Sequence, residues 1–443
     1  DQQNGDSYQE DLYVPGYFEM SIEKDEEIIL SASDILVDTS ILFDEFDYEL
    51  KKRTPRSNFY NCLRNSSHQF YYIPKNHETY LLAGYPWFKV RARDLFISLP
   101  GSTLAVDRVD DFEKIMDSAI PHLMDFMEEK TLKNIIKQID DPDVLLWAIW
   151  ALQQYWKENK EAFKTKYPPF LFFVMNYILA NKHPNLKVNK ETGLVFTNGH
   201  DVAVSWMNAM LHDKPVVPRS GYLVEFNALW YNALCFAEEI AEITGETELT
   251  TLFQEKAEIV RRTFVSTFMN GAGYLYDYVE NDYSDVNVRP NMIFAVSLDY
   301  SPLERSQQKS VIDYVTKELL SNCGIRTLSP KSGNFKPHYT GSIEEKTFAY
   351  FNGIAFPWLF GPYIEAYLKV FHKSGLSLAD RIMVAMEGEM QNDCIGTISE
   401  MYDSTPPFSG RGGFSFAMSV AELLRALKLM KAYEEEPQKG STI

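Results

Sequence analysis

Apolar residues recur every three or four positions over most of the chain from about residue 56 onward, which predicts amphipathic α-helices. Two neighbouring segments at 223–244 and 247–268 show this period, and Gly245 between them suits a helix C-cap. The short connection predicts that the two helices pack antiparallel. The same period predicts helices at about 56–71, 94–106, 107–130, 143–160, 167–182, 202–211, 223–244, 247–268, 290–298, 303–321, 352–373, 376–391 and 413–433.

Longer irregular loops interrupt this pattern and collect the tryptophans, charged residues, asparagines and glycines. They lie at about 72–93, 183–201, 269–289, 322–351 and 392–412. About a dozen helices with elaborate loops after every second one predict an all-α fold. We expect an (α/α)6 toroid whose loops build one open end.

The N-terminal part of the chain has a different pattern. Polarity alternates over 17–31 around a charged turn at Lys24–Glu26, which predicts a β-hairpin, and 32–54 suits a linking helix. A lone hairpin is marginally stable. We therefore expect residues 1–54 to be the tail of an upstream β domain with a linker, and 55–443 to be the helical domain.

Composition and charge restrict the partners. The net charge is −19, from 43 Lys and Arg against 62 Asp and Glu, so the surface repels phosphate backbones and anionic lipid. We expect neither nucleic-acid nor membrane partners, whereas a neutral substrate is compatible. The longest apolar run, 170–180, is shorter than the roughly 20 residues of a membrane span. No signal-peptide pattern opens the chain, and we expect a cytoplasmic protein that is a fragment of a longer one.

Several kinds of chemistry find no support in the sequence. The four cysteines are far apart, the eight histidines are scattered, and neither set has metal-ligand spacing, so we expect no metal or other cofactor. No HExxH, Walker loop or GxSxG motif is present. Carboxylates beside aromatic residues in loops remain as the candidate chemistry.

The stretch from Tyr85 to Gly101 is the first such cluster. It places Trp87 shortly before Arg93 and Asp94. An aromatic face suits the C–H face of a pyranose, and a guanidinium beside a carboxylate suits its vicinal hydroxyls. The alternative is a buried tryptophan with an ion pair that caps the next helix.

Three later clusters combine acids, amides and aromatic residues in the same way. Each member has a structural alternative: Glu225 favours a helix dipole, Trp358 suits the core, and Asp403 suits a turn. Together the clusters favour glycoside chemistry, in which two carboxyl groups flank the scissile bond. Their candidate residues are Trp206, Asn208, Arg219, Glu225, Asn227 and Trp230 in the first, Arg289, Asn291, Asn352 and Trp358 in the second, and Glu400, Asp403 and Arg411 in the third.

These stretches resemble the C-terminal domain of glycogen debranching enzymes, the amylo-α-1,6-glucosidase family. The resemblance covers about residues 55 to 433, in the family's order. The stretches that carry it are YPWFKVRARDLFISLPG, SWMNA with PVVPRSGYLVEFNALWYNAL, RPNMIFAVS with NGIAFPWLFGPYIEAYLK, and GTISEMYDSTPPFSGRGG. It implies an (α/α)6 barrel that hydrolyses α-1,6-linked glucose at branch points of glycogen, with inversion at the anomeric carbon.

The resemblance also implies roles for residues. Glu400 matches the general base that activates water. Arg93 and Asp94 match the pair that grips the non-reducing glucose, with Trp87 as its platform. Glu225 and Asn227 match positions that contact substrate. Two carboxyl groups are then expected roughly 6.5–9.5 Å apart across the cleft.

The sequence departs from the family at the acid. The family's TWMDA motif carries an aspartate as general acid, and Asn208 stands there in this chain. Phe351 and Phe356 replace a histidine and a tryptophan common in the family, and Ala92 stands where glycine is usual. Losing the acid costs about 10²- to 10⁴-fold in rate. Glu225 is the best nearby candidate for another acid, and Asp201 and Asp213, in segments expected to be exposed loop, are weaker candidates.

Three hypotheses follow. The first is an inverting α-1,6-glucosidase, motivated by the ordered clusters and Glu400. The second, motivated by Asn208, is a module that binds glucan without cutting it or cuts it weakly. The third is a related (α/α)6 glycosidase of another specificity. The expected partner in each case is glycogen or another branched α-glucan.

Overall fold

The computed structural model describes residues 13–75, 77–132, 135–392 and 395–435. In these residues the fold is mostly α-helical, as predicted, and strands occur only as short antiparallel pairs and small sheets. No helix in the described part of the chain is long and apolar enough to cross a membrane. Cys62, Cys235 and Cys323 are free thiols, whereas Cys394 lies outside the described residues.

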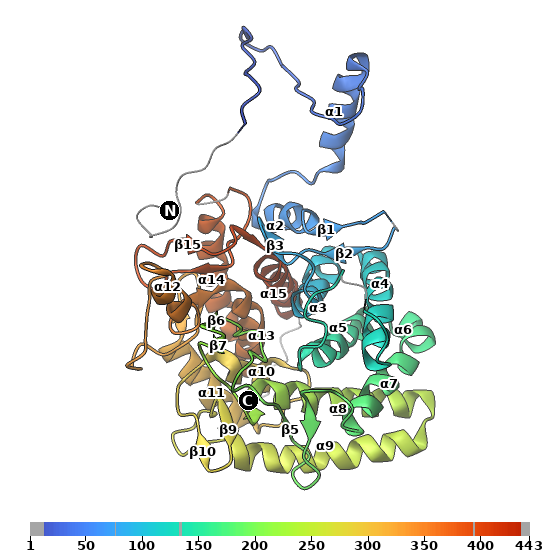
Figure 1. Ribbon diagram of the computed structural model, residues 1–443, viewed down its shortest axis with the longest axis vertical. Helices are drawn as coiled ribbons and strands as arrows, with labels where there is room; N and C mark the ends of the chain where they lie inside the picture. Colours follow the sequence, from blue (N-terminus) through green and yellow to red (C-terminus); the bar gives the residue numbers. More distant parts are fainter. Residues whose placement is uncertain (1–12, 76, 133–134, 393–394, 436–443) are drawn as a thin grey trace, which may run out of the picture.

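An inner layer of helices surrounds the centre of the molecule (Figure 1). Within the described residues each of six helices contacts the next, and the last one returns to the first. This closed order of contacts is consistent with the inner layer of the expected toroid. The six helices are α3 (Ala92–Ser102), α5 (Val144–Glu158), α8 (Val224–Thr244), α10 (Phe294–Ser297), α13 (Phe360–Phe371) and α15 (Ala417–Glu435).

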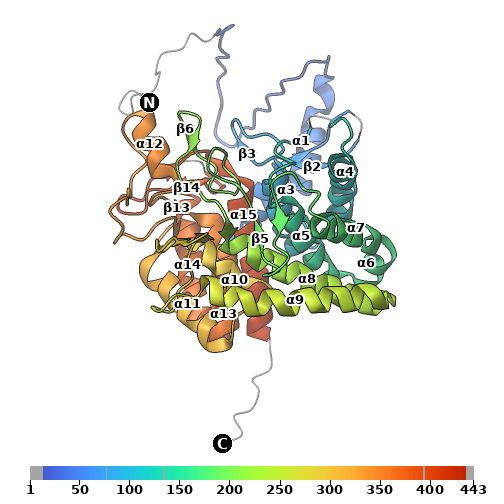
Figure 2. The same ribbon diagram turned by 60° about the horizontal axis from the view of Figure 1, so that its bottom comes forward.

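Outer helices cover this layer. The outer helices are amphipathic, whereas the inner ones are apolar on most sides. For example, every residue of α3 is buried, whereas α9 buries only Phe253, Ala257, Val260, Phe264 and Phe268. Figure 2 shows α9 lying along α8, as their short connection predicted. The outer helices are α2 (Phe59–His68), α4 (Val109–Met127), α7 (Pro168–Leu179), α9 (Thr247–Phe268), α11 (Arg305–Glu318) and α14 (Leu376–Glu389).

The contact between α3 and α15 is unusually close at Gly101. A Cβ built on Gly101 would lie 1.9 Å from the carbonyl oxygen of Ala421. Only a glycine therefore fits at this point. The last residue of the Tyr85–Gly101 stretch lets the first and last inner helices meet, which closes the layer.

Short strands join loops that are far apart in the sequence. β3 pairs with β16, so that Tyr85 lies opposite Ser415. One five-stranded sheet has the order β11-β12-β13-β14-β15, and a three-stranded sheet has the order β10-β9-β8. The strands are β1 (Tyr71–Tyr72), β2 (Tyr80–Leu81), β3 (Gly84–Tyr85), β4 (Lys187–Val188), β5 (Val195–Phe196), β6 (Met210–Leu211), β7 (Lys214–Pro215), β8 (Tyr222–Leu223), β9 (Tyr278–Glu280), β10 (Tyr283–Ser284), β11 (Leu320–Ser321), β12 (Gly324–Arg326), β13 (Ala355–Phe356), β14 (Met401–Tyr402), β15 (Gly410–Arg411) and β16 (Ser415–Phe416).

The predicted hairpin at 17–31 is wrong. This segment contains no strand, and its apolar side chains, such as Tyr17 and Phe18, are exposed. The physical reason is that two strands without a third partner or a packing surface have little to stabilise them. The linking helix is shorter than predicted: α1 (Leu42–Lys52) follows a 3₁₀ turn at Thr39–Ile41 and stands away from the helical body (Figure 1).

Two predicted helices also differ. Residues 202–211 are irregular and end in a hairpin whose turn residues His212 and Asp213 have φ of 50° and 58°. The predicted helix at 352–373 opens instead as β13 and a 3₁₀ turn before α13, since Ala355 pairs with Arg326 and Tyr402 in the five-stranded sheet. In both segments tertiary contacts override the helical period.

Two short helices were missed. α6 (Lys160–Lys166) begins at Asn159, whose side chain accepts a hydrogen bond from the backbone N–H of Ala162. α12 (Ile343–Tyr350) begins with a capping box formed by Ser342 and Glu345. That spacing is a readable signal in the sequence. It places Tyr350 at the helix end, next to the candidate site.

Candidate functional site

Residues from all four sequence clusters line one small cavity of about 30 Å³. Glu400 and Asn208 are both among them, so the structure brings together the expected base and the residue at the expected acid position. We call this space the inner cavity. Its lining residues are Arg91, Arg93, Asp94, Trp206, Asn208, Tyr350, Phe351, Phe356, Trp358, Glu400, Phe416 and Met418.

A second, more open cavity of about 400 Å³ shares Arg91, Asn208 and Tyr350 with the first. We call it the outer cavity, and the two together the cleft. Its lining residues are Trp87, Phe88, Lys89, Arg91, Lys137, Gln138, Asn208 and Tyr350. The arrangement suits a ligand that places one end in the inner cavity and extends outward.

Glu400 is a buried carboxylate held from two sides. Its Oε1 accepts a hydrogen bond from the hydroxyl of Tyr350, and its Oε2 accepts one from the backbone N–H of Gly413 at 2.8 Å. Burial raises the pKa of Glu400, while these two hydrogen bonds act in the opposite direction. A buried carboxyl with a raised pKa is a feature of groups that exchange protons in catalysis.

Asp94 is the second carboxyl-bearing residue among those lining the inner cavity. It lies in the first turn of α3 and is buried. Burial raises the pKa of Asp94, opposed by the guanidinium groups of Arg91 and Arg93. Nη1 of Arg91 is 3.9 Å from Oδ1 of Asp94.

Arg93 is committed to buried ion pairs. Its Nε and Nη2 donate to the carboxylate of Asp143 at 2.7 Å each, and Nη2 also donates to Asp141 at 2.7 Å. Burial raises the pKa of Asp141 to about 6. Arg93 therefore fixes the start of α3 against the start of α5. It is also one of the residues that line the inner cavity.

Aromatic rings form one wall of the inner cavity. Trp206 packs edge-on against Phe351, Phe356 and Trp358, with ring centroids 5.4, 5.4 and 5.1 Å away. Its indole N–H donates to Oδ1 of Asn291 at 2.7 Å. The two phenylalanines, which depart from the family pattern, stack with centroids 5.6 Å apart. The wall is therefore apolar and closely packed.

Trp87 lies at the entrance rather than in the inner cavity. It is 63% exposed and packs edge-on against Phe88, over whose ring the guanidinium of Arg91 lies at 4.3 Å. An exposed indole in a cavity lining is available to stack on a ligand. Trp87, the predicted platform, therefore lines the outer cavity.

Arg219 and Glu225 do not line the cleft. The Arg219 guanidinium donates to both carboxylate oxygens of Glu225 and, through Nε, to Asp277 at 2.6 Å. All three side chains are buried. Burial raises the pKa of Glu225, although Arg219 opposes this shift. In this structure Glu225 is a partner in an ion-pair network and does not face the space where Glu400 lies.

Asn227 and Trp230, also on α8, are fully buried and do not line the cleft either. Asn227 donates to the carbonyls of Val195 and Leu223 and accepts from the N–H of Val195. The indole of Trp230 donates to the carbonyl of Gly193. Both side chains therefore hold the loop that carries β5 against the helix.

The remaining predicted residues brace the loops that carry the cleft. Arg289 donates to the carbonyl of Phe351 at 2.7 Å and to Oδ1 of Asn352 at 3.1 Å. Asp403 accepts from Arg411 at 2.8 Å and from the N–H of Tyr339 at 2.7 Å. None of Arg289, Asn352, Asp403 and Arg411 is among the cleft-lining residues.

Several lining residues were not predicted as site residues, and Tyr350 and Arg91 are the most prominent. Arg91 lies two residues before Arg93 in the Tyr85–Gly101 stretch, and Tyr350 directly precedes Phe351 and Asn352. Both adjacencies were visible in the sequence. Lys137 and Gln138 of the outer cavity carried no such signal, because they follow α4 in an unremarkable connection.

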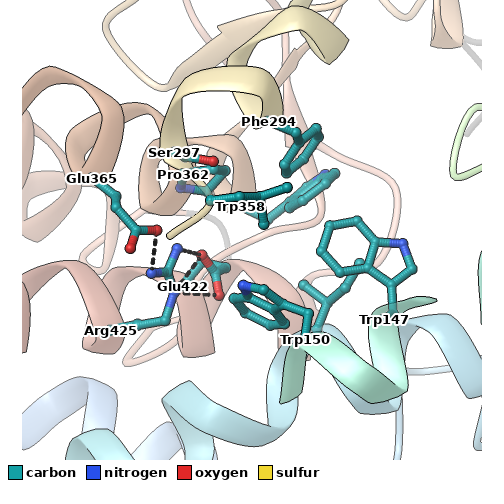
Figure 3. A pocket seen from close by; sticks show the side chains of 11 residues that line it. Trp147, Trp150, Phe294, Ser297, Trp358, Pro362, Glu365, Glu422 and Arg425 are labelled. Carbon is teal, nitrogen blue, oxygen red and sulfur yellow. Dashed lines mark hydrogen bonds and ion pairs between the residues drawn. The ribbon is translucent and has the colours of Figure 1, made fainter. Parts of the chain in front are cut away.

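Trp358 lines the inner cavity and also a second, very small space of about 10 Å³. A network of buried charges lines this second space (Figure 3). There Arg425 donates to Glu422 and, at 2.7 Å, to Glu365. Figure 3 shows Trp150 beside this network and Trp147 beyond it. The network fixes α13 to α15. In the described residues no group of three or more His, Cys, Asp or Glu side chains could hold a metal ion.

Two comparisons with known proteins identify the family. A glycogen debranching enzyme of Saccharomyces cerevisiae is 22% identical over an alignment that covers 44% of this chain and 15% of the yeast protein. The matched part is thus a small share of that relative. The family model described as amylo-alpha-1,6-glucosidase matches residues 64–425, which is most of the chain and includes every cluster that lines the cleft. The chain therefore belongs to the amylo-alpha-1,6-glucosidase family, whose members are debranching-type glycoside hydrolases.

Proposed function

We propose that this chain binds a branched α-glucan in the cleft and hydrolyses α-1,6-linked glucose, with Glu400 as general base. The observation that carries the proposal is the position of Glu400 in the wall of the inner cavity, together with Asp94, Asn208 and Trp358. The attacking water and a sugar hydroxyl would fit the inner cavity, whose volume is about 30 Å³, and the sugar ring would lie in the outer cavity, where Trp87 would stack on it.

The proposed reaction needs a base and an acid. Glu400 takes a proton from water as its oxygen attacks the anomeric carbon, and the bond from that carbon to the glycosidic oxygen breaks with inversion. The leaving oxygen must gain a proton. The amide of Asn208 is too weak an acid to supply it, and Glu225 is held by Arg219 away from the cleft lining, so water in the cleft must donate this proton. We therefore expect slow hydrolysis, at a rate about 10²- to 10⁴-fold lower than with a carboxylic acid at position 208.

A second candidate function is glucan binding without hydrolysis. Asn208 favours it, because this residue lines both cavities and an amide there can hydrogen-bond a sugar hydroxyl. In that case the cleft would retain Trp87, Asp94 and the aromatic wall as a recognition surface. A further alternative is that the chain is a related glycosidase with a different substrate specificity. Measuring the products released from isomaltose, panose, trehalose and glycogen would distinguish this alternative.

The experiment that tests the proposal compares wild type with Glu400→Gln on panose and on a branched limit dextrin. Free glucose and the anomer formed first are measured. Glu255→Gln, a change at an exposed glutamate of α9, serves as the matched control. Hydrolysis is expected in wild type and in the control and to be lost in Glu400→Gln. Equal residual release by all three proteins, with calorimetry still showing glucan binding, would favour the second candidate.

A further inference from the structure

A second polar groove lies outside the cleft, in the loops that follow α7, precede α8 and follow α9. Its volume is about 550 Å³. The strands β4, β5 and β8 and the connection between β9 and β10 supply its walls, and Figure 1 shows β5 beside α8. We call it the asparagine groove, because its lining includes Asn185, Asn189, Asn198 and Asn281.

The lining of the asparagine groove suits a neutral polyhydroxyl ligand. Phe196 is 37% exposed and packs edge-on against Tyr222, with centroids 6.0 Å apart, so two aromatic rings face the same space. Amide side chains offer donors and acceptors together, as sugar hydroxyls require.

The charges in the groove do not favour an anion. His200 and Glu280 face each other, with Nε2 3.0 Å from Oε1, and the same oxygen accepts a hydrogen bond from Ser220 at 2.8 Å. Lys187 donates to the carbonyl of Asn181. The chain also carries a net charge of −19. A histidine and a carboxylate in hydrogen-bond contact suit hydroxyl recognition better than phosphate binding.

The groove is held in shape by its own hydrogen bonds. Asn189 donates to the hydroxyl of Tyr222 at 2.8 Å, and Asn185 exchanges hydrogen bonds with the backbone of Asn198 at 2.8 and 2.9 Å. The hydroxyl of Thr197, in the same wall, has no partner among the described residues. A preformed groove costs little ordering when a ligand binds.

The groove is also connected to the cleft. Thr197 pairs with Gly221 across the groove wall, and Arg219, two residues before Gly221, donates to Ser205 at 3.2 Å. Ser205 directly precedes Trp206 of the aromatic wall. The six steps along the chain from His200 to Trp206 span at most about 22 Å, so two chains of one branched glucan can reach both places.

We propose that the asparagine groove is a second α-glucan binding site, which holds an outer chain of a branched glucan while another chain end occupies the cleft. The choice of an α-glucan rests on the proposed function. That the ligand is a neutral carbohydrate is inferred from the residues that line the groove. The benefit is an increased effective concentration of chain ends at the cleft.

The experiment measures retardation of the folded protein during native electrophoresis in gels that contain glycogen, and calorimetric binding of maltoheptaose. The test variants are Phe196→Ala and Asn281→Gly. Glycine suits position 281 because Asn281 has a φ of 50° and is exposed, so the fold is preserved. Phe173→Ala on α7 is the matched control, since Phe173 is 38% exposed and does not line the groove.

Each test variant is expected to weaken glycogen binding by about 3- to 10-fold, the usual worth of one aromatic or hydrogen-bonding contact. Phe173→Ala is expected to bind as wild type does. Wild-type binding in Phe196→Ala and Asn281→Gly, or no retardation of wild type by glycogen, would overturn the proposal. Glucose release from panose is measured separately, so a failure of the proposed hydrolysis is distinguishable from a failure of the groove.

Discussion

The hydroxyl of Tyr350 donates a hydrogen bond to Oε1 of Glu400, although 50 positions separate the two residues in the chain. Tyr350 ends α12, and Glu400 directly precedes β14. Burial raises the pKa of Glu400, and the hydrogen bond from Tyr350 lowers it. Tyr350 therefore helps to keep the proposed base deprotonated and oriented.

We predict that Tyr350→Phe lowers kcat on panose by about tenfold or more, because a hydrogen bond to a charged group contributes about 1.5–3 kcal/mol. The pKa of Glu400 should rise further, so the acid limb of the pH–rate profile should move to higher pH. Tyr363→Phe is the control, since buried Tyr363 hydrogen-bonds Thr316 on the outer side of the ring. An unchanged acid limb in Tyr350→Phe would contradict the assigned role.

Restoring a carboxyl at position 208 should increase hydrolysis. Asn208 lines both cavities, so Asn208→Asp places a proton donor in the space that Glu400 faces. We expect the initial rate of glucose release from panose to rise by about 10²- to 10⁴-fold. Asn392→Asp, at an exposed position, adds the same charge elsewhere and should leave the rate unchanged. If Asn208→Asp binds glucan but releases no glucose, the binding-only function is favoured.

Glu400→Gln should change stability in a pH-dependent way. A carboxyl whose folded pKa is raised stabilises the fold below its unfolded pKa and loses that contribution as pH rises through the folded pKa. At pH 7 wild type holds a buried carboxylate, whereas the amide side chain of the variant does not ionise. The variant is therefore expected to unfold at higher urea concentration than wild type at pH 7, with a difference that shrinks as pH falls to 4.

Glu225→Gln should lower the stability of the fold and should not affect the catalytic step directly. Glu225 forms a buried two-oxygen contact with Arg219, and breaking one partner of such a pair costs about 3–5 kcal/mol. Urea unfolding measures the loss, with Glu191→Gln at an exposed position as the control. A selective loss of kcat with no change in unfolding would instead support Glu225 as the missing acid.

Gly101→Ala should destabilise the fold, because its Cβ would lie 1.9 Å from the Ala421 carbonyl oxygen between α3 and α15. Overpacking of this kind costs about 1–3 kcal/mol or more. Gly388→Ala is a sharp comparison, since that glycine lies in α14 with nothing within 4 Å of the new Cβ. It should stabilise by about 0.5–1 kcal/mol. Thermal unfolding of both variants gives the comparison, and equal effects would contradict the close helix contact.

The sequence by itself determined the helical class, the family and the segments that matter. The period of α9 was readable because only one face of this helix is buried, and Gly245 between α8 and α9 adopts the left-handed conformation of a C-cap, with φ of 81°. The segments around Trp87, Asn208, Trp358 and Glu400 were recognised as clusters, and the cleft contains residues from all of them.

Only the tertiary structure decided which members of a cluster face the cleft. Glu225 and Trp230 belong to a recognised segment, yet α8 directs them into an ion-pair network and the core. Tyr350 and Arg91 reach the cleft because the paired strands and the ring of inner helices bring their loops beside Glu400. The period of a helix shows that one face is buried. It does not show what that face is buried against, because this depends on contacts between segments far apart in the chain.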